Sequence, residues 1–243
     1  MKWSAFAKGF GETGSLVLLF GLVTLPNVAL AQEAPSLTPH RMFVGGGAVW
    51  SGGYDIGEAA AELRGNGIGS TPPVFTLFRA KSRVTRAISP EARVGYSVTR
   101  QLAAEFSFAL AQPHVSVSIS GDAEAPAQQL PGEQLQQFQI GGAVTWQIPI
   151  PRMSNGIGNA LAPFAIGGAT FLRQLHEDRT MGETGQVYYA GGGARYFLRG
   201  GHGYGRAYGL RADARVNFRR NGIEFEDKMR IFPTVSLAAF VGF

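Results

Sequence analysis

Apolar and polar side chains alternate at every second position along most of the chain. Residues 91–98 and 206–219 show the pattern most cleanly, and in the second stretch Arg211, Asp213 and Arg215 lie opposite an unbroken row of apolar or small residues. A period of two residues is the repeat of a β-strand with one polar and one apolar face, and an α-helix does not produce it. The pattern therefore predicts an all-β chain.

Segments of this kind recur down the sequence and are separated by connections of two lengths. We predict strands at residues 42–50, 90–98, 102–119, 134–148, 161–175, 186–198, 206–219 and 230–243. The connections are alternately tight and long, except that residues 149–160 are longer than a tight turn. Tight turns at one end and long loops at the other are typical of outer-membrane barrels. We therefore expect an all-β fold, an eight-stranded antiparallel transmembrane β-barrel of the up-and-down type.

Two segments depart from this simple scheme. In residues 102–119 the apolar side chains share one face as far as Leu110 and move to the other face beyond Pro113. Either a bulge at Gln112 and Pro113, or a strand that leaves the apolar medium there, would produce this change. Residues 73–84 could form an extra strand or one arm of an extracellular hairpin. Because bacterial single-chain barrels have even strand numbers, we assign them to the first loop.

Charged residues lie in the middle of several predicted strands, on the polar face. In a soluble barrel, which is the alternative, they would point into water and the apolar face would fill the interior. The apolar face extends over nearly all strands, however, and aromatic residues lie near strand ends, as in interfacial girdles. A membrane span built of strands must close into a barrel, and the outer wall of such a barrel is apolar. We therefore place the apolar face toward lipid. Arg173 is placed on the polar face, and we expect a paired lumen network of Glu91, Arg93, Glu105, Arg195, Arg211, Asp213 and Arg215.

This network is expected to close the lumen. An eight-stranded barrel has an interior just wide enough for side chains, and an unpaired buried charge is costly. A selectivity lining, as in a small passive channel, is the alternative function of these charges.

The N-terminal residues have the composition of a secretory signal peptide. Lys2 and Lys8 precede the apolar stretch 15–25, and residues 29–31 form an Ala-Leu-Ala cleavage site. We predict a cleaved signal peptide at 1–31, followed by a flexible lead-in at 32–40 and the barrel at 41–243, with an uncleaved membrane anchor as the alternative.

Composition excludes several classes of function. An exported chain with no cysteine has no disulfide framework, thiolate metal site or cysteine nucleophile. The formal net charge is +5, but the basic residues are scattered, so we expect no nucleic-acid partner.

Four features occur together in this sequence: the signal peptide, the long first loop, the hairpin "PEARVGYSVTRQLAAEFSFAL" from Pro90 to Leu110, and a final alternating strand that ends in Phe243. With these features the chain resembles the small outer-membrane β-barrel proteins of the outer-membrane protein A and X type. The resemblance implies an outer-membrane location, in contact with lipid and lipopolysaccharide. It also implies that the β-barrel assembly machinery reads the last strand, through Phe243, Phe240 and Val241 as an assembly signal.

His114 and Ser116 are the candidates for catalysis. Two residues apart on a strand, they share a face on which imidazole could activate the hydroxyl. The pair is similar to the His-x-Ser motif of lipid A deacylases, with Glu124 or Glu133 as a distant orienting carboxylate, but Val117 stands where that family has Asn. A lipid A-modifying barrel enzyme is therefore the alternative function. We expect a polar strand end near the extracellular rim and no catalytic residue.

Other candidate sites predict no cofactor or metal. His176-Glu177-Asp178 is a weak ligand set in a loop, and the glycine runs 45–47 and 191–193 lie within strands, where they do not predict a phosphate site. Binding to an extracellular ligand would be a property of the polar loops 121–134, 174–186 and 219–230. The sequence thus predicts a non-enzymatic outer-membrane barrel with a structural or surface-interaction role.

Overall fold

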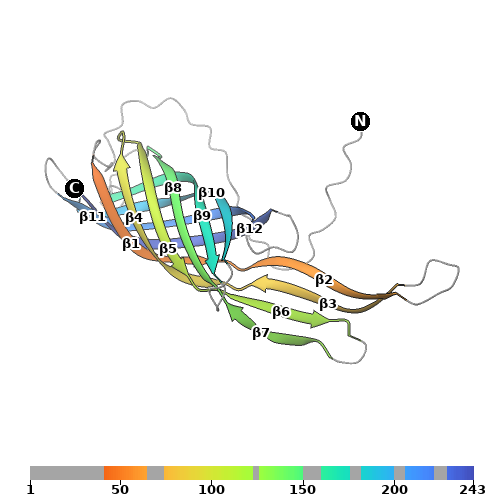
Figure 1. Cartoon of the computed structure of the whole chain (residues 1–243). Helices are drawn as coiled ribbons and strands as arrows, with labels where there is room; N and C mark the ends of the chain where they lie inside the picture. The colour runs from red at the N-terminus through yellow and green to blue at the C-terminus, as the bar shows by residue number, and fades with distance from the viewer. Residues whose placement is uncertain are drawn as a thin grey trace, which may run out of the picture. The chain divides into compact units, whose positions relative to one another are not determined.

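The computed structural model describes residues 41–64, 74–122, 126–149, 160–175, 182–199, 206–221 and 229–243. The expected signal peptide at 1–31 and lead-in at 32–40 lie outside these residues. The described chain forms a closed barrel and a second, four-stranded sheet (Figure 1). No helix in these ranges is long and apolar enough to cross a membrane.

The barrel is closed and antiparallel throughout. Its strands are β1 (Met42–Ser51), β4 (Ala87–Ser97), β5 (Leu102–Ala111), β8 (Gln136–Gln147), β9 (Leu161–Leu175), β10 (Gly182–Arg199), β11 (Ala207–Arg220) and β12 (Arg230–Gly242). Their order around the ring is β1-β12-β11-β10-β9-β8-β5-β4, and β1 also pairs with β4. Each barrel strand thus neighbours the next barrel strand along the chain, and closure leaves no unpaired barrel edge. The predicted eight-stranded antiparallel barrel is confirmed.

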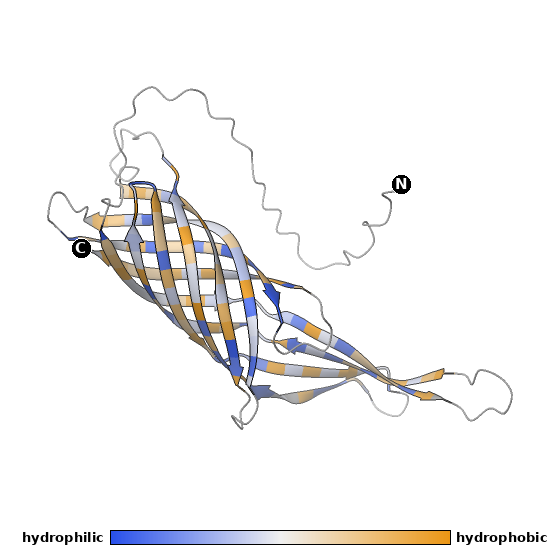
Figure 2. Cartoon of the chain, turned by 45° about the horizontal axis from the view of Figure 1, so that its top comes forward, coloured by the Kyte–Doolittle hydropathy of each residue, from blue (hydrophilic) through white to orange (hydrophobic). Residues whose placement is uncertain are grey.

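Hydrophobic and hydrophilic residues alternate along the barrel strands (Figure 2), and the burial of their side chains separates two surfaces. Large apolar side chains point outward and stay exposed, as shown by Phe106 at 54%, Trp146 at 60% and Leu237 at 62%. The intervening positions point inward and are buried, although many are polar or charged. The outer wall of the barrel is therefore apolar and its interior encloses charged side chains, the reverse of a water-soluble barrel.

Strand β9 is an exception to this rule. Phe164 and Ile166 are buried in the lumen, whereas Ala165 and Gly167 face outward. The placement of Arg173 with the enclosed charges was wrong, because its side chain is exposed on the outer wall. Both faces of this strand are apolar or small, so the pattern carried little contrast.

Four further strands form the second sheet. These are β2 (Tyr54–Arg64), β3 (Val74–Val84), β6 (His114–Ser120) and β7 (Gln128–Gln134), in the order β2-β3-β6-β7. They extend the chain beyond β1, β4, β5 and β8 at one end of the barrel (Figure 1). Residues 73–84 are not an extra barrel strand, as expected, but they are not an irregular loop either, since β3 is an arm of a hairpin with β2 and also pairs with β6. The predicted strand at 102–119 is likewise two strands in two sheets.

The polarity of the strand faces inverts between β5 and β6. Exposed and buried positions keep alternating through Gln112 and Pro113, so the strand contains no slip there. In β5 the outward residues, such as Phe108, are apolar, whereas in β6 they are polar, as Ser118 is. The apolar residues of β6 lie on the other face, where Val115 packs against buried side chains at the barrel end. This geometry matches a strand that leaves an apolar medium, rather than a bulge.

The junction between the two sheets is hydrogen-bonded. Thr85 N–H donates to the His114 carbonyl at 2.9 Å, and Leu135 N–H donates to the Pro113 carbonyl at 2.9 Å. At Gly53 a Cβ atom would lie 2.7 Å from the Val84 carbonyl oxygen, so only glycine fits this close approach. Proline at 113 has no N–H to donate, which suits a position where one ladder ends and another begins.

Polar side chains on the exposed face of this second sheet form surface ion pairs. Lys81 Nζ lies 3.1 Å from an Asp55 oxygen and 3.4 Å from a Glu58 oxygen. The hydrogen bond that Lys81 donates to Asp55 raises the pKa of Lys81 above its ordinary value. These side chains are about half exposed, so the pairs stabilise the sheet little.

Candidate functional site in the barrel lumen

One end of the lumen is filled by an aromatic cluster, here called the base cluster, of Phe43, Ala103, Ala162, Phe197 and Phe240. The rings of Phe197 and Phe240 meet edge to face, with centroids 5.3 Å apart. The Phe43 ring lies against Gly95 on the neighbouring strand, where a Cβ atom would collide with it. The base cluster is an apolar, closely packed layer across the barrel.

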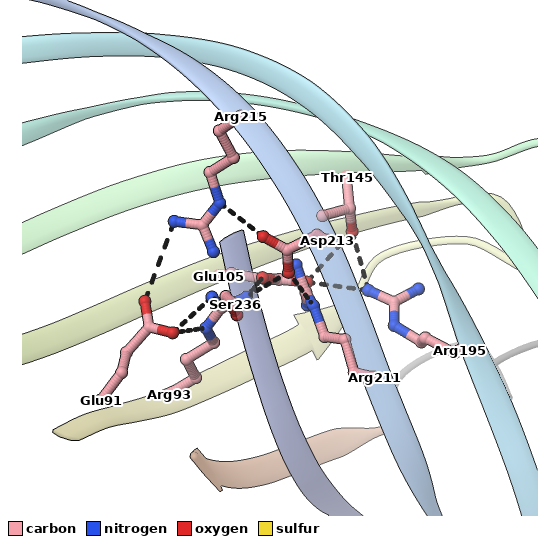
Figure 3. A network of polar contacts seen from close by, with 9 residues as sticks. All are labelled: Glu91, Arg93, Glu105, Thr145, Arg195, Arg211, Asp213, Arg215 and Ser236. Carbon is pink, nitrogen blue, oxygen red and sulfur yellow. Dashed lines mark hydrogen bonds and ion pairs between the residues drawn. The ribbon is translucent and has the colours of Figure 1, made fainter. Parts of the chain in front are cut away.

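A network of ion pairs lies in the lumen (Figure 3). It adjoins the base cluster at Arg195, whose guanidinium lies 5.5 Å from the centroid of the Phe43 ring. Arg93 on β4 binds Glu91 through two nitrogens and Asp213 through a third contact of 3.0 Å. Asp213 also accepts hydrogen bonds from Arg211 Nε at 2.8 Å and from Arg215 Nε at 2.6 Å. One carboxylate on β11 therefore gathers three guanidinium groups.

Glu105 on β5 is the second centre of the network. Its Oε1 accepts hydrogen bonds from Arg211 at 2.6 Å and from Arg195 at 2.8 Å, and the Thr145 hydroxyl lies 3.3 Å away. Arg93 approaches its other oxygen at 4.0 Å. The four charged side chains in these contacts are between 2% and 4% exposed, so solvent does not screen the ion pairs.

The network carries more positive than negative charge. Its arginines are Arg93, Arg195, Arg211 and Arg215, and its carboxylates are Glu91, Glu105 and Asp213, so four charges against three leave a net charge of +1. Aromatic rings offset part of this excess. The guanidinium of Arg195 lies 4.6 Å, and that of Arg211 4.5 Å, from the centroid of Phe164. An aromatic face attracts a cation, most strongly where water is excluded.

A small cavity lies on the other side of the network, toward the second sheet. Its volume is about 40 Å³, enough for about three water molecules. Two donors on residues that line it, Gln137 Nε2 and Arg215 Nη2, have no hydrogen-bond partner in the described structure. Ordered water in the cavity would satisfy both.

Beyond the cavity lies a second apolar layer, here called the mouth cluster, of Tyr54, Ile56, Val84, Leu172, Val187 and Phe232. The rings of Tyr54 and Phe232 have centroids 5.0 Å apart. Arg219 is fully buried beside this cluster and donates to the Tyr54 hydroxyl and, at 2.6 Å, to Gln174 Oε1. Tyr54, Ile56 and Val84, at the barrel-proximal ends of β2 and β3, thus help to fill the lumen.

The structure brings together all seven residues proposed from the sequence for the lumen. Each takes part in at least one ion pair. Two further residues take part that the predicted network did not include: Ser236, which accepts a hydrogen bond from Arg93 at 2.8 Å, and Phe164. The position of Ser236 on the polar face of an alternating strand was a usable signal, whereas nothing in the pattern placed Phe164 inside.

The residues proposed as an assembly signal lie on both faces of the last strand. Phe243 and Val241 are exposed on the outer wall, at 51% and 39%. Phe240 is 5% exposed and belongs to the base cluster. Recognition by the assembly machinery stays a prediction.

The proposed catalytic pair lies on β6, outside the barrel. His114 and Ser116 share a face, and no hydrogen bond joins their side chains in the described structure. Glu133 pairs in register with Val115, which places it on the opposite face from His114. Glu124 and the segment His176-Glu177-Asp178 lie outside the described residues. Within the described ranges, no group of three acidic or histidine side chains could hold a metal ion.

Comparisons with known proteins give distant structural similarity alone. No model of a protein family matches the chain, and no curated protein matches it. The outer membrane protein OprG from Pseudomonas aeruginosa is similar in structure, with 10% identity, 87% of this chain and 99% of that chain covered, and a TM-score of 0.45. For Ail, the attachment invasion locus protein of Yersinia pestis, the values are 9%, 85%, 100% and 0.40. The fold assignment rests on the chain's own strand pairing, and membership of the A and X type stays a prediction.

Proposed function

We propose that the protein is a non-enzymatic outer-membrane β-barrel with a closed lumen, which holds a four-stranded sheet above the outer surface of the cell as an interaction surface. The barrel anchors the protein in the membrane, and the sheet formed by β2, β3, β6 and β7 contacts partners in the medium. The ion network braces the barrel from within and does not conduct.

The observation that carries this proposal is the inversion of polarity where the strands leave the barrel. Outward side chains are apolar and exposed in β5, and polar in β6, although one nearly continuous strand path contains both. Water would disfavour so many exposed large apolar side chains around a whole barrel, whereas lipid favours them. The inversion supports a membrane boundary near Gln112 and Pro113, with the second sheet in water.

The layers of side chains that fill the lumen support a barrel that does not conduct. The base cluster, the ion network and the mouth cluster follow one another along the axis, and the cavity between them has a volume of about 40 Å³. An eight-stranded barrel has little room besides its side chains.

Planar-bilayer recording tests the closed lumen. The refolded protein is first shown to be inserted, by its heat-modifiable migration on a denaturing gel. We expect no steady channel current from inserted protein. Steady currents in the range of a general porin would contradict the closed lumen and favour the passive channel.

A role for the second sheet follows from its edges. In the order β2-β3-β6-β7, the strands β2 and β7 each have a single neighbour within the sheet. Leu63 and Phe75, which pair across β2 and β3, are 55% and 57% exposed. Exposed edges and apolar side chains are features of contact surfaces. Deleting the hairpin beyond Glu58 and Lys81 should leave the barrel folded and abolish binding of the cells to their surface partners.

A further inference from the structure

Two arginines on the outer wall of the barrel take no part in the lumen network. Arg173 lies on β9 and Arg220 on β11, with β10 between these strands. Both side chains are exposed, and their sequence neighbours Leu172 and Arg219 are buried inside the barrel. In the described structure neither guanidinium has an ion pair or a hydrogen bond. These two charges are thus directed outward, without a partner among the residues that the structure describes.

The strand register brings the two arginines within reach of one another. Arg220 pairs with Gln186 on β10, and Arg173 pairs with Thr184 on the same strand. The arginines are therefore two strands apart and offset by two residues. With about 4.8 Å between strands and about 3.4 Å per residue, their Cα atoms are separated by about 12 Å. Two extended arginine side chains can reach a common group across that distance.

The β10 residues between the arginines add hydrogen-bond donors. Gln186 Oε1 accepts a hydrogen bond from the Tyr188 hydroxyl at 2.9 Å, which leaves the Gln186 amide nitrogen as the free donor. Thr184 is exposed beside it and offers a hydroxyl. The four side chains of Arg173, Thr184, Gln186 and Arg220 thus present donors and no carboxylate. Guanidinium groups bind phosphate oxygens in bidentate geometry, so this set is complementary to a phosphate.

Apolar side chains continue from this donor set toward the middle of the barrel. Phe171, two residues before Arg173, is 49% exposed, and Tyr188, two residues after Gln186, is 48% exposed. Phe218 precedes Arg220 by two residues and is half-buried. The outer wall therefore changes within one step from apolar to cationic on β9 and β11, and from apolar to polar at Gln186 on β10. A ligand that fits this change carries an anionic phosphate next to its acyl chains.

We infer that Arg173, Gln186 and Arg220 form a binding site for a phosphate group of lipid A, the membrane anchor of lipopolysaccharide, with its acyl chains against Phe171 and Tyr188. This inference rests on the proposed outer-membrane location. Leu175, two residues beyond Arg173, pairs with Gln136 at the start of β8, which directly follows β7 of the second sheet. The site is therefore at the end of the barrel that bears the second sheet, which is the end where outer-leaflet phosphates would lie. Acyl contacts distinguish the lipid from a free phosphate ion.

The opposite end of the barrel supplies a matched control. Arg206 is also an exposed arginine on the outer wall, and its guanidinium lies 5.7 Å from the centroid of the Phe243 ring. Its replacement removes the same charge from the same barrel at the other membrane boundary.

The test is a titration of the refolded barrel in phosphatidylcholine bicelles with diphosphoryl lipid A, read by chemical-shift changes. The double variant R173Q/R220Q should bind at least about tenfold more weakly than the unaltered barrel, because it loses two charge-assisted contacts. R206Q should bind within about twofold of the unaltered barrel. Dephosphorylated lipid A should bind weakly to all three barrels, and the variant R173K/R220K should retain part of the affinity.

Three results would overturn the inference. These are equal binding by R173Q/R220Q and the unaltered barrel, an equal loss in R206Q, or full competition by inorganic phosphate at the concentration of lipid A. Heat-modifiable migration of the same samples reports insertion. An inserted barrel that is insensitive to the double replacement contradicts the lipid site alone, whereas a chain that does not insert contradicts both the site and the proposed function.

Discussion

Arg211 donates a hydrogen bond of 2.6 Å to Glu105 from the opposite wall of the barrel. The two residues lie on β11 and β5, which are four strands apart in both directions around the eight-stranded ring. Because Asp213 joins Arg211 to Arg93 on β4, the same network connects most of the circumference. The barrel is therefore braced by charge across its diameter as well as by hydrogen bonds around its wall.

Replacing Glu105 with Gln should destabilise the barrel strongly. The change leaves Arg195 and Arg211 buried without their main carboxylate, and loss of one partner from a buried ion pair costs about 3–5 kcal/mol. Urea unfolding in phospholipid vesicles, followed by tryptophan fluorescence, measures the change in free energy. Glu58→Gln removes an exposed ion pair with Lys81 and should cost less than about 1 kcal/mol. Equal losses in the two variants would contradict the brace.

Gly95 should not tolerate even a methyl group. An added Cβ atom would lie 2.0 Å from Cζ of the Phe43 ring, and overpacking of this kind costs about 1–3 kcal/mol. The double variant Gly95→Ala with Phe43→Leu should recover part of the loss, as measured by the same unfolding assay. Gly142→Ala is the control, because a Cβ atom there meets no heavy atom within 4 Å. An effect of Gly95→Ala that persists unchanged in the double variant would contradict this packing.

The surroundings of the barrel wall and of the second sheet can be compared by placing an arginine on each. Val144 points outward from the barrel and is 52% exposed, and Arg at a lipid-facing position costs up to about 4 kcal/mol. Ser118→Arg, on the outward face of β6, should change stability by less than about 0.5 kcal/mol. The measurement, for this variant and for Val144→Arg, is unfolding in vesicles. A similar small effect at both positions would mean that the barrel wall faces water.

Much of the barrel could be predicted from the sequence where its two faces differ in chemistry. The strand with Arg211, Asp213 and Arg215 alternates between charged and apolar residues, so its inward face could be predicted. The inward face of strand β9 could not be predicted, because Phe164 and Ala165 are both apolar and hydropathy does not show which of them fills the lumen. Arg173 lies near the end of the same strand, beyond the apolar part of the wall, where an outward charge does not destabilise the barrel.

The second sheet and the contacts of the network could not be predicted. Strand β2 contains the run Ala59 to Ala61, which has no period-two contrast, and β3 acquires its second partner from β6, far along the chain. Which arginine meets Glu105 depends on the stagger of strands on opposite walls. Alternation determines only that these side chains point inward.

Cysteine labelling in intact cells tests the central claim most directly, because the chain contains no cysteine of its own. Ser118→Cys lies on the second sheet, and Arg100→Cys lies in the turn between β4 and β5 at the other end of the barrel. With a membrane-impermeant maleimide, Ser118→Cys should be labelled in intact cells and Arg100→Cys only after the outer membrane is permeabilised. Labelling of both or neither in intact cells, or recovery of the protein in the soluble periplasmic fraction, would contradict a barrel that spans the outer membrane with its second sheet outside.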